Sequence, residues 1–237
     1  MTIIRRALLV MSPDEGKNHL PGVAIDEQNW TAHLRSPIGG AWNSSEVRIL
    51  HNPLPMALAM ALNWTADADY TLIAFSGHGE GKSEDETELQ VHPDYAIPAT
   101  KLVSAASRQT IVLDCCRQPK KETLLEASLE KKYATDARRE PLDARRRFDE
   151  HLKKCAPFRV TLNSCAFRQV AGENEAIGGF YTNELLKAAR LASPGKVMDV
   201  RDSHKVARAQ VMHRQPSQTP VGNLPRTGDT FPLGLGF

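Results

Sequence analysis

The chain has 237 residues, of which 41% are hydrophobic and 24% charged, so it can bury the core of one large domain or two small ones. Its formal net charge of +2 gives no indication that it binds nucleic acid or an anionic membrane. The first apolar run, Ala7 to Met11, is shorter than a secretory signal core of about 7 to 15 residues or a membrane span of about 20. We therefore expect a cytoplasmic protein with reduced cysteines that binds neither nucleic acid nor membrane.

Short apolar segments alternate along the chain with segments of helical periodicity, which is typical of an α/β domain with a mostly parallel sheet. The predicted strands are Arg6 to Met11, Glu46 to Leu50, Tyr70 to Ser76, Thr110 to Asp114 and Arg159 to Cys165. Most are continuous apolar runs, as expected where both faces of a sheet are covered. The predicted helices lie at about 22–35, 54–65, 98–107, 122–154, 180–192 and 197–213. The short apolar tail, 228–237, is a candidate for a further edge strand.

One segment stands out by charge. Residues 117–154 contain twelve Lys and Arg against eight Asp and Glu, a net charge of +4. Pro141 precedes a pattern in which Leu142, Phe148 and Leu152 can share one helix face. Two interpretations stay open: a solvated helix pair joined by a turn, or a segment for recognition or processing. We expect a single domain over 1–237 with a basic helical insertion at about 117–155.

Two predicted strands end in residues that can carry chemistry. In parallel sheets, sites form outside the carboxyl ends of the strands. The segment FSGHG, 75–79, places a histidine between two glycines, and the segment LDCCR, 113–117, ends a strand in two cysteines. An imidazole can move protons near neutral pH, and the Gly79 amide can donate to a developing oxyanion. A cysteine attacks as its thiolate, so the two segments together predict a Cys/His dyad with either cysteine as nucleophile.

With these motifs the sequence resembles the caspase-like cysteine peptidases, which comprise caspases, metacaspases and their bacterial, metacaspase-like or orthocaspase-like relatives. The shared pattern is a strand ending in S-G-H-G and a later strand ending in D-x-C or Q-A-C, followed by a basic residue or His. Segment 19–34, HLPGVAIDEQNWTAHL, looks like the family's first crossover, with Asp26 on its helix. Segment 159–188, beginning RVTLNSCAFRQVAGENE, and QTP at 218–220 are similar to later parts of the family.

The resemblance implies a caspase-like three-layer α/β sandwich, with a mostly parallel central sheet of about six strands and helices on both faces. It implies a cysteine endopeptidase that needs no cofactor, with Cys116 as nucleophile and His78 as general acid and base. The backbone amides of Gly79 and Cys116 would form the oxyanion hole.

In metacaspase-like members, the aspartate two positions before the nucleophile pairs with a basic residue that precedes the scissile bond. Here that aspartate is Asp114, and strand alternation puts it on the same side as Cys116, with Cys115 on the other. A guanidinium binds a carboxylate bidentately, so we expect cleavage after Arg in preference to Lys. Ser164 and Cys165 lie on the strand that borders this pocket in the family, although packing is the simpler role for Cys165.

The remaining expectations concern metals and regulation. The acidic loop at 79–94 lacks a recognisable calcium-ligand spacing, and the four cysteines lack paired C-x-x-C spacing, so we expect no metal site and treat calcium dependence as a minor alternative. The basic insertion occupies the place of the family's scissile connection, and self-cleavage at Arg139 or Arg147 is a hypothesis. An activating partner protein is a second hypothesis.

Two rival functions stay open. The first is a catalytically silent caspase-like module that binds or regulates a partner. The second is a redox or metal sensor built on Cys115 and Cys116.

Overall fold

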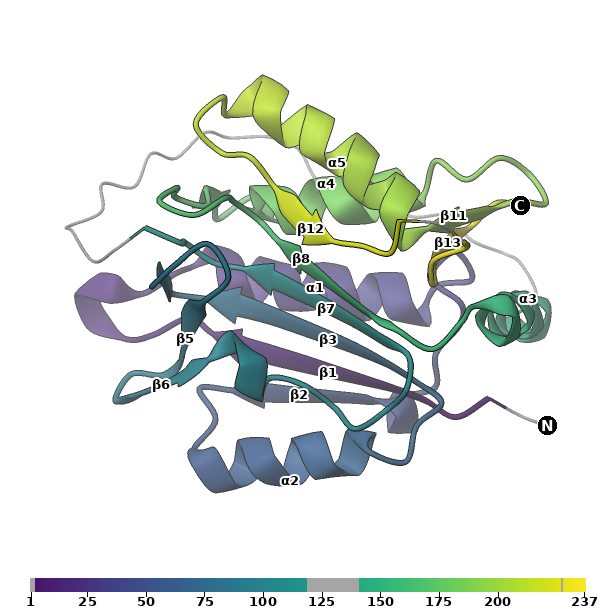
Figure 1. Cartoon of the computed structure of the whole chain (residues 1–237), viewed down its shortest axis with the longest axis horizontal. Coiled ribbons are helices and arrows are strands. Elements are labelled where there is room, and N and C mark those ends of the chain that lie inside the picture. The colour runs from purple at the N-terminus through teal and green to yellow at the C-terminus, as the bar shows by residue number, and fades with distance from the viewer. Residues whose placement is uncertain (1–2, 119–140, 227) are drawn as a thin grey trace.

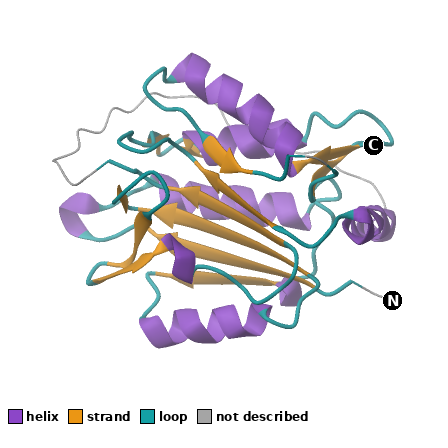
Figure 2. Cartoon of the chain, viewed as in Figure 1, coloured by secondary structure: helices purple, strands orange, loops and turns teal. Residues whose placement is uncertain are grey.

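The computed structural model describes residues 3–118, 141–226 and 228–237. At its centre lies a six-stranded sheet with the strand order β12-β8-β7-β3-β1-β2 (Figures 1 and 2). Neighbouring strands run parallel, except that β12 is antiparallel to β8. The strands are β1 (Arg5–Ser12), β2 (Val47–His51), β3 (Tyr70–Gly77), β7 (Gln109–Asp114), β8 (Arg159–Asn163) and β12 (Val221–Asn223).

Two apolar layers cover the two faces of this sheet and make the predicted three-layer sandwich. Side chains of β1 alternate between them, with Leu9 packing in one layer and Leu8 in the other. The first layer is formed by α1 (Gly22–Arg35), α3 (Pro141–Lys154), α4 (Phe180–Ala189) and α5 (Val200–Arg214). The second is formed by α2 (Pro55–Thr65) and by an antiparallel sheet of β4 (Gly79–Gly81), β5 (Thr87–His92) and β6 (Tyr95–Pro98).

Local signals in the sequence explain where two helices begin. Pro55 occupies the first turn of α2, where its missing N–H costs nothing. Asp199 caps α5, because its side chain accepts a hydrogen bond of 2.8 Å from the Asp202 amide. No helix among the described residues is long and apolar enough to cross a membrane.

The carboxyl ends of β1, β3 and β7 point to the same side of the molecule, where the loop before α1 and the β4–β5–β6 sheet also lie (Figure 1). The β3–β7 register pairs Ser76 with Asp114, and the β1–β3 register pairs Ser12 with Gly77. The topology therefore brings the SGHG and DCC motifs to adjacent positions at one edge of the sheet.

The predicted helix at 98–107 is wrong. The chain there ends β6 and makes only a single 3-10 turn at Ala99–Lys101. The Gln109 side chain donates hydrogen bonds of 2.7 and 2.6 Å to the carbonyls of Ser104 and Ala106, and it accepts one of 3.1 Å from the Ser104 amide. These side-chain contacts satisfy backbone groups that a helix would otherwise pair.

The C-terminal tail does not extend the central sheet. Its strand, β13 (Pro232–Leu235), pairs antiparallel with β11 (Val197–Asp199) in a separate two-stranded sheet, so the helix predicted from 197 begins only at Val200. The edge strands of the central sheet are the three-residue strand β12 and, on the other side, β2. Of the helix predicted at 122–154, residues 141–154 form α3, and residues 122–140 lie outside the described residues.

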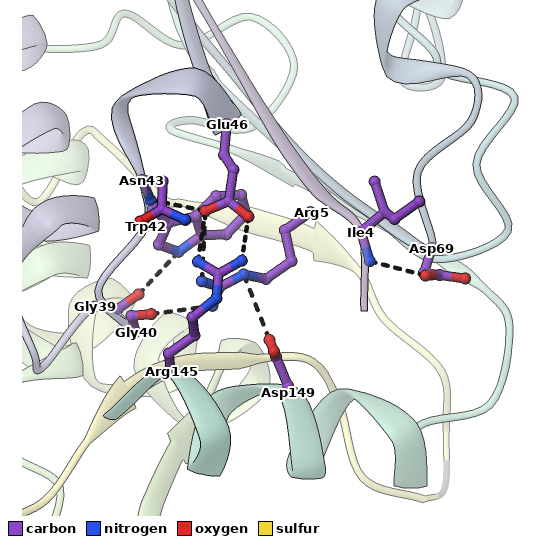
Figure 3. Close-up of polar contacts among 10 residues, drawn as sticks. All are labelled: Ile4, Arg5, Gly39, Gly40, Trp42, Asn43, Glu46, Asp69, Arg145 and Asp149. Carbon is purple, nitrogen blue, oxygen red and sulfur yellow. Dashed lines mark hydrogen bonds and ion pairs between the residues drawn. The ribbon is translucent and has the colours of Figure 1, made fainter. Parts of the chain in front are cut away.

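A buried cation begins β1. Arg5 is 0% exposed, and its guanidinium donates a 3.0 Å hydrogen bond to the Gly40 carbonyl. It lies 3.6 Å from a Glu46 carboxylate oxygen and 3.4 Å from one of Asp149 (Figure 3). Burial lowers the pKa of Arg5 to about 10, and the charge of Asp149 is the main effect that opposes this.

The same cluster attaches α3 to the body of the protein. The Arg5 guanidinium lies 4.6 Å from the Trp42 ring centroid and 5.0 Å from that of Phe148 on α3. Arg145, one turn earlier on α3, donates a 2.7 Å hydrogen bond to Glu46 (Figure 3). Ionic and aromatic contacts of Arg5 therefore join β1, the turn before β2 and α3.

We predict that Arg5→Met lowers the free energy of unfolding by about 3 kcal/mol, because it leaves buried carboxylate charge without its cation. Arg146→Met is the matched control, since Arg146 pairs at 2.7 Å with Asp143 and Glu150 and its side chain is 61% exposed. Loss of such a surface pair costs about 1 kcal/mol or less. Urea unfolding of both variants tests this, and equal losses would contradict the role given to Arg5.

Candidate active site

A cavity of about 310 Å³ opens at the carboxyl edge of the sheet. Its wall includes the ends of β3 and β7, the loop before α1 and the loop that follows β8. The lining residues with titratable side chains are Lys17, Asp26, His78, Asp114, Cys115, Cys116 and Glu173. The structure therefore brings the predicted dyad and the predicted specificity aspartate into one cavity.

His78 follows β3 directly. Its Nε2 lies 2.6 Å from the backbone carbonyl oxygen of Asn18. Since a carbonyl only accepts hydrogen bonds, Nε2 carries the proton of the neutral ring and Nδ1 keeps the lone pair. The His78 carbonyl accepts a 3.0 Å hydrogen bond from the Gln90 amide on β5. The Asn18 contact holds the ring through Nε2, and Nδ1 is the nitrogen that can take up a proton.

Cys116 is the one cysteine with partial exposure; Cys115, Cys155 and Cys165 are buried. Its Sγ lies 3.8 Å from the Ala171 carbonyl. Burial raises the pKa of the Cys116 thiol, and the Asp114 carboxylate adds to the rise. The thiol is therefore the resting form at neutral pH, and attack on a substrate requires a base to remove its proton.

Cys115 packs in the apolar layer beneath the cavity, on the α2 side of the sheet. Gly79 lies against both cysteines: a Cβ at this position would be 2.6 Å from Cys115 Sγ and 2.7 Å from the Cys116 carbonyl oxygen. Only glycine allows so close an approach. The two residues predicted for the oxyanion hole, Gly79 and Cys116, are thus neighbours in space.

Two buried aspartates share the floor of the cavity. One oxygen of Asp114 accepts hydrogen bonds from the Thr182 amide at 2.9 Å and the Thr182 hydroxyl at 2.7 Å. Asp26, on α1, accepts from the Ser76 hydroxyl at 2.6 Å and the Gly179 amide at 2.9 Å. Burial raises the pKa of both carboxyl groups, and for Asp26 the negative charge of Asp114 adds to the rise.

Glu173 supplies a third carboxylate from the short hairpin of β9 (Glu173–Asn174) and β10 (Gly178–Gly179). Burial raises its pKa to about 7, with a further contribution from Asp114. Sequence reasoning did not assign Asp26 or Glu173 to the site. The available signal was that both acids lie inside segments that resemble the family.

Ser164 and Cys165 are fully buried and are not among the residues that line the cavity. The Ser164 hydroxyl accepts a hydrogen bond from the Cys115 amide and donates one to the Cys115 carbonyl, both at 3.1 Å. Cys165 Sγ donates to the same carbonyl at 3.4 Å. Both residues therefore support the nucleophile loop from beneath, and a direct contact with substrate stays a prediction.

Arginines of the basic segment lie in two settings. Arg117 is buried and donates a 2.8 Å hydrogen bond to the Thr87 hydroxyl on β5, so it belongs to the packed structure. Arg147 is on α3, where it donates a 3.0 Å hydrogen bond to the Gly236 carbonyl. Arg139 lies outside the described residues.

The acidic segment at 79–94, which forms β4, β5 and the turns that follow them, contains ion pairs of its own. Lys82 lies 2.9 Å from a carboxylate oxygen of Glu80 and 3.0 Å from one of Glu88. Within the described parts of the chain, no group of three or more His, Cys, Asp or Glu side chains is arranged to hold a metal ion.

A cysteine and a histidine at the carboxyl edge of a mostly parallel sheet, with helices on both faces, define a caspase-like α/β protein. The family model for the caspase domain matches residues 4–229, and the chain belongs to this family of cysteine peptidases. Among solved structures, it is similar to caspase-1 from Spodoptera frugiperda, with a TM-score of 0.65 and 13% identity over 99% of this chain and 91% of that chain. That likeness concerns the fold. A comparison with curated proteins finds no match.

We predict that brief treatment of the native protein with iodoacetamide alkylates Cys116 alone, because the other three cysteines are 0 to 3% exposed. Mass spectrometry of the digested protein identifies the labelled residue, and Cys116→Ala should remove the native label. After denaturation all four cysteines should react. Labelling of Cys115 as fast as Cys116 in the folded protein would contradict its assignment to the core.

Proposed function

We propose that the protein is a cysteine endopeptidase that cleaves after a basic residue, with Arg preferred over Lys. One observation carries this proposal: Cys116, His78 and three carboxylates line the same cavity. The cysteine and histidine can carry out amide hydrolysis, and the carboxylates can bind a cationic substrate side chain next to the dyad.

The arrangement supports a stepwise mechanism. His78 Nδ1 takes the Cys116 proton as sulfur attacks the peptide carbonyl carbon, and the amides of Gly79 and Cys116 hold the resulting oxyanion. His78 then gives its proton to the leaving amine, which leaves an acyl thioester on Cys116. Water, deprotonated by His78, hydrolyses the thioester and restores the free thiol.

The three carboxylates explain the direction of the proposed specificity. Among the described residues, no ion pair with Lys or Arg joins Asp26, Asp114 or Glu173. A guanidinium offers five N–H donors in a planar fork, so it can bind several of their oxygens at once, whereas an ammonium offers three donors from one point. An acidic side chain in this cavity would meet three carboxylates against one cation, Lys17.

Several finer expectations stay predictions: cytoplasmic location, an activating partner, independence of calcium and self-cleavage in the basic insertion. The bond after Arg147 lies within α3, so cleavage there would require that helix to unwind locally. The silent-module alternative predicts no turnover from the same fold. The sensor alternative predicts a response that depends on Cys115 as much as on Cys116, although Cys115 is buried.

We predict that a fluorogenic peptide with Arg before the scissile bond is cleaved faster than its Lys analogue and far faster than its Asp analogue. Cys116→Ala and His78→Ala should each lower kcat by at least about a thousandfold, because they remove members of one catalytic unit. Cys155→Ala is the control, since Cys155 is buried away from the cavity at the end of α3. Faster cleavage after Asp than after Arg would contradict the specificity, and activity retained in Cys116→Ala would contradict the mechanism.

We also predict that KM for the Arg peptide falls as pH rises through about 7. Below this pH Glu173 is protonated and neutral, and above it the side chain becomes a carboxylate that attracts the substrate cation. Glu173→Gln should raise KM at pH 8 and flatten its pH dependence. Glu86→Gln, which changes an exposed acid of the turn before β5 that does not line the cavity, is the matched control and should leave the profile unchanged. An unaltered profile in Glu173→Gln would contradict this role.

A further inference from the structure

Asp14, in the loop after β1, directs its carboxylate toward the Nε2 side of His78. One Asp14 carboxylate oxygen lies 3.8 Å from His78 Nε2, and the Asp14 side chain is 8% exposed. The same oxygen accepts a 3.4 Å hydrogen bond from the Gln90 side chain, and the other accepts one of 2.8 Å from the Glu15 amide. The carboxylate is therefore held in place beside the imidazole.

The backbone at Asp14 is unusual. Its φ is +61°, in the left-handed region that few residues other than glycine, asparagine and aspartate adopt. The loop closes through a 2.7 Å hydrogen bond from the Leu20 amide to the Pro13 carbonyl. It also carries Asn18, whose carbonyl bonds His78 Nε2. One loop thus presents both a carbonyl oxygen and a carboxylate to the same ring nitrogen.

These contacts matter at the moment of proton transfer. When His78 Nδ1 takes the proton from Cys116, the ring becomes a cation that still bears its proton on Nε2. A carboxylate within about 4 Å stabilises that cation, whereas a carbonyl supplies only a dipole. We propose that Asp14 is a positioning residue that orients His78 and stabilises its protonated form during thiol activation. This inference rests on the proposed peptidase function.

Several other titratable groups lie near His78, and none of them is changed by a substitution of Asp14. Glu80 follows on β4 and is engaged by Lys82. The remaining titratable groups of the cavity wall are Lys17, Asp26, Asp114, Cys115, Cys116 and Glu173. His19 faces the backbone of Asp14, with its Nδ1 3.3 Å from the Asp14 carbonyl. A substitution confined to the Asp14 side chain leaves all of these in place.

The test is Asp14→Asn. Asparagine has the same shape, tolerates the left-handed backbone and can accept the Glu15 amide through its oxygen, so the change removes the charge and the hydrogen bond from Gln90. The pH dependence of Cys116 alkylation by iodoacetamide should move to higher pH by about one unit, and kcat for the Arg peptide should fall about tenfold, with KM little changed.

Asp94→Asn is the matched control. Asp94 lies in the turn between β5 and β6, its carboxylate is 3.9 Å from His92 Nδ1, and its side chain is 93% exposed. The variant removes the same charge from a His–Asp pair of similar distance that lies outside the cavity. It should leave the alkylation profile and kcat unchanged.

His78→Ala separates failure of this inference from failure of the proposed function. If His78→Ala does not alter the alkylation profile, the dyad itself is wrong and the proposed function falls with it. If His78→Ala moves the profile but Asp14→Asn superimposes on the wild type, the role of Asp14 alone is overturned. A loss of kcat in Asp14→Asn without any movement of the alkylation midpoint would also overturn it, because a purely structural defect has that signature.

Discussion

The parallel register between β3 and β7 is the constraint on which the candidate site depends, because it pairs Ser76 with Asp114. Every residue of both strands is buried, so a slip by one position would move each side chain to the opposite apolar layer. Core packing therefore fixes where the strands end. Since paired backbones lie about 4.8 Å apart, the histidine and cysteine that follow these ends must share one space.

The fold handles buried charge differently at the two ends of β1. At the start of the strand, Arg5 contacts two carboxylates and two aromatic rings, so its charge is offset within the protein. At the opposite edge, Asp26 and Asp114 are satisfied by hydroxyl and amide donors without a protein cation among the described ion pairs. Neutral donors hold these carboxylates in position and leave their charge available to a ligand.

Sequence reasoning predicted five of the six central strands, the three-layer order and the meeting of His78 with Cys116, since these follow from apolar periodicity and family motifs. It missed the edge strand β12. Alternation along one strand also separated buried Cys115 from Cys116. Prediction from the sequence failed where contacts between distant segments decide the structure. The side chain of Gln109 replaces the predicted helix at 98–107 with a loop. The convergence of Asp26 and Glu173 on the cavity depends on how α1 and the β9–β10 hairpin pack, which spacing along the chain does not reveal.

One physical cause, burial in a cavity lined by three acids, links substrate recognition to catalysis in the proposed peptidase. Burial raises the pKa of Cys116 and Glu173, and the charge of Asp114 raises both further. A bound guanidinium would offset that negative charge, which makes both deprotonations less costly. Substrate with a basic side chain would then promote formation of the thiolate that attacks it, while an empty cavity keeps Cys116 as a weakly reactive thiol. Specificity and activation would thus draw on the same carboxylates.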